Sequence, residues 1–124
     1  SDADALCHAI AEAILGALAL GDLVNGFPDT DPKWEGADSI KILTQVGVMM
    51  RDRGYNIGNV DSLIMIEKPK MAPHIMTMRE NIARALACDL DNISVKATRG
   101  EGIGFVGKSE GVQAQAVVLL VKED

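Results

Sequence analysis

Three polar residues near the start of the chain have the spacing of one helix face. Asp4, His8 and Glu12 follow one another at intervals of four residues, and residues four apart are neighbours on a helix surface. A histidine between two carboxylates suits a metal ligand whose ring the acids orient. A solvated helix face with ordinary ion pairs explains the same stripe. That interpretation is favoured for these residues taken alone, because a catalytic zinc site normally takes three protein ligands.

The other histidine, His74, follows Pro73 at a predicted helix start. This position is more typical of a capping or surface residue than of a metal ligand.

A second polar cluster lies in residues 20–32. Asp22, Asp29 and Asp31 place three carboxylates within ten residues, and Thr30 adds a hydroxyl. Two prolines, two glycines and two aspartates in residues 25–37 predict a loop. These side chains can bind ribose hydroxyls or close over a substrate. They can equally satisfy local backbone N–H groups in turns, and the spacing leaves both interpretations open.

Two further loops have the composition of binding loops. Lys68 and Lys70 flank Pro69, whose fixed dihedral angle restricts where the side chains and amides around it point. Such a loop can bind the edge of a nucleobase, or it can be a stiff surface loop. Residues 98–108 contain four glycines, which allow backbone N–H groups to approach a phosphate closely. This stretch matches neither a Walker A loop nor a dinucleotide-binding motif.

The elements that must position these segments are predicted from periodicity and turn residues. A first helix is expected from Ser1 or Asp2 to about Leu20, on the apolar spacing of residues 6–17. Asp38 is placed to cap a second helix, which ends at Gly54. The other predicted elements are a strand at 55–66, a helix at 74–87 and strands at 93–97 and 112–122.

Two of the predicted strands carry unbroken apolar runs. Residues 63–66 are Leu-Ile-Met-Ile, and residues 117–121 are Val-Val-Leu-Leu-Val. Such runs are typical of strands buried on both faces. Because the helices can cover one face of a mixed sheet, a neighbouring subunit is expected to cover the other. The pattern therefore predicts an α+β sandwich that forms oligomers.

Composition limits the classes of function. The chain has 124 residues, enough for one domain, and its 48% apolar share with only 3% aromatics predicts an aliphatic core. A net charge of −6 argues against nucleic-acid binding. Cys7 and Cys88 are too few for a disulfide framework and suit a reducing cytosol. Residues 9–20 are too short to span a bilayer. The opening Ser-Asp-Ala-Asp lacks the basic region of a signal peptide, and without an initiator Met the N-terminus is expected further upstream.

Several short motifs lie in these segments and must be considered together. They are Ser-Asp-Ala-Asp-x-x-x-His at 1–8, Leu-Gly-Asp-Leu at 20–23, Phe-Pro-Asp-Thr-Asp-Pro at 27–32, Gly-Ala-Asp-Ser at 36–39, Gly-Asn-Val-Asp at 58–61, Pro-Lys-Met-x-Pro-His at 69–74 and Val-Lys-Ala-Thr at 95–98. In this order and spacing the chain resembles the 2-C-methyl-D-erythritol 2,4-cyclodiphosphate synthase family over essentially its whole length. Phe-Pro-Asp-Thr-Asp-Pro is a specific marker of that family.

The resemblance implies a lyase of the non-mevalonate isoprenoid pathway. Such an enzyme converts 4-diphosphocytidyl-2-C-methyl-D-erythritol 2-phosphate into the 2,4-cyclodiphosphate and CMP, as the 2-phosphate attacks the β-phosphorus. The implied fold is a single α+β domain over residues 1–124, a sandwich of a mixed four-stranded sheet with helices on one face. The implied assembly is a homotrimer with active sites between subunits. Zn²⁺ and Mg²⁺ or Mn²⁺ are the expected cofactors. The cytoplasm, or the plastid stroma in a eukaryote, is the expected location.

The resemblance also implies site residues by position. His8 corresponds to the third zinc ligand, the other two being an Asp-x-His pair upstream of Ser1. Glu101 corresponds to the ligand of a Mg²⁺ or Mn²⁺ ion that bridges the α- and β-phosphates, and Arg99 stands at a catalytic position. The residues expected at the erythritol phosphate and the ribose are Ser1 and Asp22, with Leu23 and Val24 beside Asp22. Those expected at the methylerythritol are Phe27, Pro28, Asp29, Thr30 and Asp31. Those expected at the cytosine are Ile66, Glu67, Lys68, Pro69, Lys70, Met71 and Ala72, with Lys70 near a phosphate, and those at the substrate edge or the trimer axis are Thr98, Phe105 and Lys108.

Three residues depart from the family pattern. Arg99 stands where a small hydroxyl residue is credited with stabilising the transition state, although a positive side chain there can still neutralise developing phosphate charge. Lys108 replaces an arginine and loses its bidentate fork. Glu12 replaces the aspartate behind the zinc-binding histidine.

The incomplete zinc site leaves an alternative from another class. It is a catalytically silent trimer that binds cytidine nucleotides or isoprenoid diphosphates, and an upstream Asp-x-His pair would distinguish the enzyme from it. A purely structural trimer would leave the Phe-Pro-Asp-Thr-Asp-Pro loop at 27–32 and the Pro-Lys-Met loop at 69–71 without a role.

Overall fold

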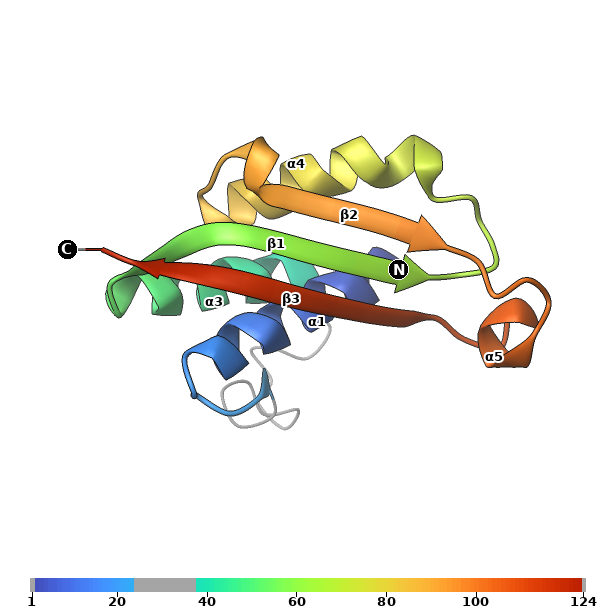
Figure 1. Ribbon diagram of the computed structural model, residues 1–124, viewed down its shortest axis with the longest axis horizontal. Helices are drawn as coiled ribbons and strands as arrows, with labels where there is room; N and C mark the ends of the chain where they lie inside the picture. The colour runs from blue at the N-terminus through green and yellow to red at the C-terminus, as the bar shows by residue number, and fades with distance from the viewer. Residues whose placement is uncertain (1, 24–37, 124) are drawn as a thin grey trace.

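A mixed β-sheet with helices packed on one of its faces forms the molecule (Figure 1). The structure, a computed structural model, describes residues 2–23 and 38–123. The elements in chain order are α1 (Asp2–Ala17), α3 (Ser39–Asp52), β1 (Tyr55–Met65), the 3₁₀ turn Ala72–His74, α4 (Ile75–Leu86), the 3₁₀ turn Leu90–Asn92, β2 (Ile93–Thr98), α5 (Gly104–Gly107) and β3 (Gln113–Lys122). The α+β class expected from the sequence is confirmed.

The sheet has the strand order β2-β1-β3. β1 runs parallel to β2 and antiparallel to β3, so Asp61 of β1 pairs with Ser94 on one side and with Val117 on the other. Among the described residues the sheet has three strands, and the predicted four-stranded sheet is wrong for this part of the chain. The glycine-rich stretch between β2 and β3 folds into turns and the short helix α5, because glycine is a poor strand former.

The two faces of the sheet differ in their environment. On β1 the side chains of Val60, Ser62 and Ile64 face the helices and are buried. On β3 the outward-facing Val117 and Leu119 are 73% and 62% exposed. Three helices cover the inner face, and the outer apolar face is open to solvent within one chain, so the expected cover from a neighbouring subunit stays a prediction.

Helix ends depend on local backbone hydrogen bonds. Asp38 caps α3 as predicted, its carboxylate accepting the Ile40 N–H at 2.9 Å. α1 ends at Ala17, three residues earlier than expected. Ala19 adopts a left-handed conformation with φ of 55°, and Leu20 N–H donates to the Leu15 carbonyl. This pairing closes the helix without the glycine that usually marks such an end.

The core is aliphatic, as the composition predicted. It lies between the inner face of the sheet and the helices α1, α3 and α4. The largest fully buried side chains are Leu6, Ile10, Ile14, Leu15, Leu43, Val46, Met50, Val60, Ile64, Ile82, Leu86 and Ile93. Gly47 lets α3 approach α4 closely, since a Cβ there would lie 3.2 Å from the Ala85 carbonyl oxygen. In the described part of the chain no helix has the length and apolarity needed to cross a membrane.

Candidate functional site

The parallel strands β1 and β2 end side by side and send two loops out from the same edge of the sheet. Their last registered pair is Met65 with Thr98, and the Ile66 N–H extends the ladder by donating to the Thr98 carbonyl at 2.9 Å. Residues 66–74 then lead into α4, and residues 99–111 lead into β3. Ligands commonly bind at the carboxyl ends of parallel strands, since loops from separate parts of the chain meet there.

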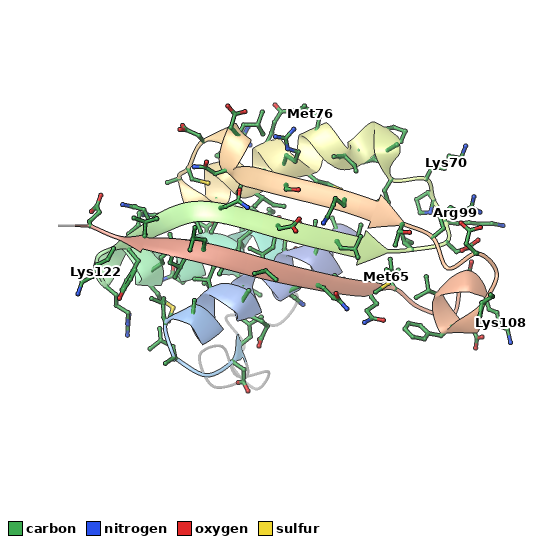
Figure 2. All side chains as sticks on the ribbon, in the orientation of Figure 1. Met65, Lys70, Met76, Arg99, Lys108 and Lys122 are labelled. Carbon is green, nitrogen blue, oxygen red and sulfur yellow. The ribbon has the colours of Figure 1, made fainter. Side chains whose placement is uncertain are left out.

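A cavity of about 260 Å³ lies between these two loops and is called the two-loop cavity below. Its lining residues are Ile66, Lys70, Met71, Ala72, Ile75, Ala97, Thr98 and Arg99. Apolar side chains form most of the wall, and two cationic residues contribute the charge. Figure 2 shows Lys70 and Arg99 at the same end of the molecule, next to the carboxyl ends of β1 and β2. A mostly apolar wall with a few polar groups suits a flat ring that carries an anionic substituent.

Glu67 connects the two loops. Its Oε1 atom accepts a hydrogen bond from Nη2 of Arg99 at 3.1 Å, and its Oε2 atom accepts one from the Gly100 backbone N–H at 2.9 Å. The Glu67 side chain is only 10% exposed, whereas Arg99 is 53% exposed. The carboxylate is thus held within the protein, while the guanidinium remains accessible to a ligand.

Residues 99–111 form a compact unit, called the glycine lobe below. A Cβ on Gly100 would lie 2.3 Å from the backbone nitrogen of Gly107, and one on Gly107 would lie 2.5 Å from the carbonyl carbon of Gly102. Backbone therefore packs on backbone with no room for side chains. Glu101 has a φ of 54° and an exposed side chain on this lobe. Lys108 follows α5 and is also exposed.

A second cavity, of about 190 Å³, lies beside the first. Its lining residues are Ile66, Glu67, Lys68, Ser109, Glu110, Gly111 and Val112. Glu67 borders this second cavity rather than the two-loop cavity. The carboxylate is therefore connected to the two-loop cavity indirectly, through its hydrogen bonds to Arg99 and Gly100.

The polar stripe of α1 has partners of its own. Oε1 of Glu12 accepts the Leu23 N–H at 2.7 Å, which ties the end of the following turn to the helix. Asp4 accepts a hydrogen bond from the Ser39 hydroxyl at the start of α3. His8 is exposed on the same helix. No cluster of three or more His, Cys, Asp or Glu side chains suited to a metal ion occurs in residues 2–23 and 38–123.

These contacts test whether zinc fits the described residues. His8 offers one nitrogen ligand, and the neighbouring carboxylate of Glu12 is already hydrogen-bonded to backbone. A zinc site needs further ligands. The described residues by themselves do not provide a zinc site.

The structure brings together one subset of the predicted site residues and leaves others apart. Six of them line the two-loop cavity: Ile66, Lys70, Met71, Ala72, Thr98 and Arg99. Pro69 is exposed in the loop between Lys68 and Lys70. Phe105 is 51% exposed on α5, and Asp22 and Leu23 follow α1. The predicted residues Ser1, Val24, Phe27, Pro28, Asp29, Thr30 and Asp31 lie outside the described residues.

Three residues at this site received no individual role from the sequence, although Gly100 is one of the four glycines in residues 98–108. Ala97 and Ile75 line the two-loop cavity, and Gly100 donates its N–H to Glu67. Ala97 and Ile75 appeared as ordinary apolar positions at the end of a strand and the start of a helix. His74 is an exposed residue without a side-chain capping bond. Its predicted alternative as a surface residue is therefore confirmed.

A third cavity, of about 260 Å³, lies where α1 and α3 begin. Cys7 lines it and is 3% exposed. Burial raises the pKa of this thiol to about 11, so it stays protonated at neutral pH and is a poor nucleophile. This agrees with its expected place as a small core residue.

Comparison with known proteins identifies relatives over nearly the whole chain. The model of the YgbB family matches residues 1–121. A protein of Clostridium perfringens named 2-C-methyl-D-erythritol 2,4-cyclodiphosphate synthase is 59% identical over 122 residues, which are 98% of this chain and 78% of that protein. A protein of the same name from Trichlorobacter lovleyi is 57% identical over 123 residues, 99% of this chain and 78% of its own length.

A solved structure extends the likeness to a ligand complex. The structure of the CDP complex of IspF from Plasmodium falciparum is 29% identical in sequence to this chain, with a TM-score of 0.83. The match covers 95% of this chain and 70% of that one.

Proposed function

Since the chain belongs to the YgbB family and carries out the activity for which its relatives are named, the synthesis of 2-C-methyl-D-erythritol 2,4-cyclodiphosphate, we propose that the two-loop cavity receives the cytidine end of the substrate. One observation carries this proposal. A largely apolar cavity bordered by Lys70 and Arg99 lies between the two loops that the sequence singled out for a base and a phosphate. The alternative of a silent nucleotide-binding protein is not favoured, because relatives at this identity are named as synthases.

The segment proposed to bind the cytosine ring is residues 66–72. Ile66 and Met71 are buried and provide apolar surface for a ring. The proline-containing loop between them offers backbone groups to the edge of the base. Rigid backbone donors and acceptors reject a base in which the two are exchanged. The site is therefore expected to prefer cytosine to uracil.

The diphosphate belongs on the side of the cavity where β2 ends. Thr98 supplies a hydroxyl, Arg99 a guanidinium and Lys70 an ammonium group. In this net-acidic chain, these cations are the local means of neutralising phosphate charge. Glu101, exposed on the glycine lobe, is proposed to hold a Mg²⁺ or Mn²⁺ ion near the α- and β-phosphates. Such an ion would add positive charge where the substrate is most negative.

Chemistry at this site is mainly positioning and charge neutralisation. The substrate's 2-phosphate attacks its own β-phosphorus, and CMP leaves. Because nucleophile and leaving group belong to one molecule, holding the chain of atoms in line removes most of the entropic barrier. Arg99 is proposed as the residue that stabilises charge as it develops on the phosphate oxygens. Its accessible guanidinium, anchored from behind by Glu67, supports that role.

Zinc is proposed to bind through His8 together with ligands from outside the described residues. Zinc bound there would act as a Lewis acid on a phosphate oxygen. Elemental analysis of the full chain and its His8→Ala variant tests this binding. Equal zinc content in the two would exclude His8 as a ligand.

A homotrimer is the proposed assembly, and the open outer face of the sheet supports it. Leu119 and Val121 are 62% and 52% exposed there, and their burial against other subunits would remove apolar surface from water. The sequence pattern that predicted cover from a neighbour falls on the same face. The cytoplasm is the proposed location in a bacterium.

Calorimetry with CDP and UDP on the full chain tests the proposed cytidine site. CDP is expected to bind at least about tenfold more tightly than UDP, since an exchanged donor and acceptor leave polar groups unpaired. Met71→Lys should abolish CDP binding by filling the cavity with a charged chain. Met76→Lys is the matched control, because Met76 is 50% exposed on α4 and does not line the cavity. Equal affinities for CDP and UDP would refute the proposal.

A further inference from the structure

Glu67 has an unusual position among the charged residues near the two-loop cavity. It is nearly buried, yet it does not line that cavity. Each of its carboxylate oxygens accepts a hydrogen bond from a different group: the side chain of Arg99 and the backbone of Gly100. Both donors lie more than 30 residues further along the chain, in the other loop. The Glu67 carboxylate therefore links the loop at residues 66–74, proposed to bind the base, to the glycine lobe, proposed to lie beside the phosphates.

The bond to Gly100 fixes more than one residue. Gly100 packs directly on Gly107, and Gly107 packs on Gly102, at distances that leave no room for a Cβ. The Ile103 N–H also donates to the Gly100 carbonyl at 3.0 Å. Anchoring the amide of Gly100 therefore anchors the whole glycine lobe against the end of β1.

The hydrogen bond to Arg99 restricts where the guanidinium group points. Nη2 of the guanidinium donates to Glu67, and a guanidinium has five N–H donors in a planar arrangement. The remaining donors stay available on a side chain that is 53% exposed and borders the cavity. A side chain as long as arginine loses considerable rotamer entropy when it binds a ligand. The contact with Glu67 restricts it before the ligand arrives.

We infer that Glu67 is a positioning residue for the proposed nucleotide site: its carboxylate holds Arg99 and the glycine lobe at the spacing that a cytidine diphosphate group requires. The inference rests on the proposed function. The Glu67 side chain borders the second cavity rather than the two-loop cavity, so we expect it to act through Arg99 and Gly100.

The direction in which CDP affinity changes distinguishes positioning by Glu67 from the effect of its negative charge alone. A carboxylate near a diphosphate repels it, so removal of the charge alone would strengthen CDP binding. Loss of positioning would weaken it. Glu67→Ala is therefore expected to weaken CDP binding about fivefold or more, the equivalent of one partly exposed ion pair. Affinity for cytidine, which has no phosphate, should change less than about twofold.

Two further variants test the route of the effect. In an Arg99→Gln background, Glu67→Gln should alter CDP affinity less than about twofold, because partners in one contact are not additive. Glu110→Gln is the matched control, since Glu110 borders the second cavity beside Glu67 but is exposed and lies outside the two-loop cavity. This control should bind CDP as tightly as the unchanged chain or more tightly.

Hydrogen exchange provides a readout that needs no ligand. In Glu67→Ala the Gly100 amide should exchange about tenfold faster or more, because it loses its acceptor. Glu67→Gln keeps a side-chain oxygen and should restore most of the protection while CDP binding remains weakened.

Tighter or unchanged CDP binding in Glu67→Ala would overturn the inference and leave the proposed site intact. Unchanged exchange at Gly100 would overturn it as well. If the unchanged chain binds no CDP, the proposed site fails, and the exchange of Gly100 alone then decides whether Glu67 fixes the glycine lobe.

Discussion

Glu101 is a residue whose surroundings indicate function rather than stability. Its side chain is exposed on the glycine lobe, and its backbone has a φ of 54°, a conformation that non-glycine residues rarely adopt. In the proposed site, Glu101 would hold the Mg²⁺ or Mn²⁺ ion beside the phosphates, while Lys70 and Arg99 border the two-loop cavity. A carboxylate oxygen is the ligand that Mg²⁺ prefers.

Glu101→Gln should therefore leave the free energy of unfolding within about 0.5 kcal/mol of the original, as expected for an exposed side chain. It should also reduce the gain in CDP affinity that Mg²⁺ or Mn²⁺ provides. Calorimetry with and without the metal measures this gain, and thermal unfolding measures stability. Glu110→Gln, an exposed carboxylate of the same lobe, should keep the full gain. A large loss of stability with an unchanged metal effect would make Glu101 structural.

At the scale of elements, the ends of β1 and β2 determine where the site lies. The parallel register places Met65 beside Thr98, and the two loops that follow must then run together. The glycine lobe can lie close to the first loop because its own turns pack backbone on backbone. A lobe built in this way has little tolerance for added atoms.

Gly100→Ala tests that tolerance. The new Cβ would lie 2.3 Å from the Gly107 nitrogen, so the lobe must move. A stability loss of about 1–3 kcal/mol is expected from such overpacking, together with weaker CDP binding. Gly16→Ala is the control, because nothing lies within 4 Å of its added Cβ in α1. That change should be neutral or stabilising by about 0.5–1 kcal/mol. Chemical denaturation of both variants measures the difference, and equal stabilities would show that the lobe is loosely packed.

On the scale of the whole molecule, the two faces of the sheet have different surroundings. Helices α1, α3 and α4 bury the inner face. The outer face carries exposed apolar side chains on β3, next to an ion pair between Asp61 and Lys96. Contiguous exposed apolar surface is uncommon in monomers and marks protein interfaces.

Leu119→Lys should dissociate the proposed trimer, since it would place a charge in an apolar interface. Each interface is expected to bury more than about 1,000 Å² in total. Sedimentation of the full chain at micromolar concentration measures the assembly. Val48→Lys is the control, because Val48 is partly exposed on α3, away from that face. A monomeric unchanged chain would contradict the trimer, and an assembled Leu119→Lys variant would place the interface elsewhere.

Much of the fold was determined by local sequence signals. Periodicity predicted the helices at α1, α3 and α4. Apolar runs indicated β1 and β3, and the short strand β2 was also predicted. Asp38 was correctly identified as a cap, because its side chain satisfies an amide only two residues away. The motifs also indicated the family, which the comparisons confirm.

Tertiary structure decided the remaining features, since they depend on contacts between distant residues. The outer face of β3 is open within one chain, although an apolar run by itself cannot show which face the helices leave uncovered. α1 ends early because Ala19 adopts a left-handed backbone conformation, which an alanine in the sequence does not predict. Glu67 was assigned to the cytosine loop by position, but its link to Arg99 and Gly100 arises only when β1 and β2 pair in parallel. Sequence spacing could place these residues in two loops, and the sheet register brought the two loops together.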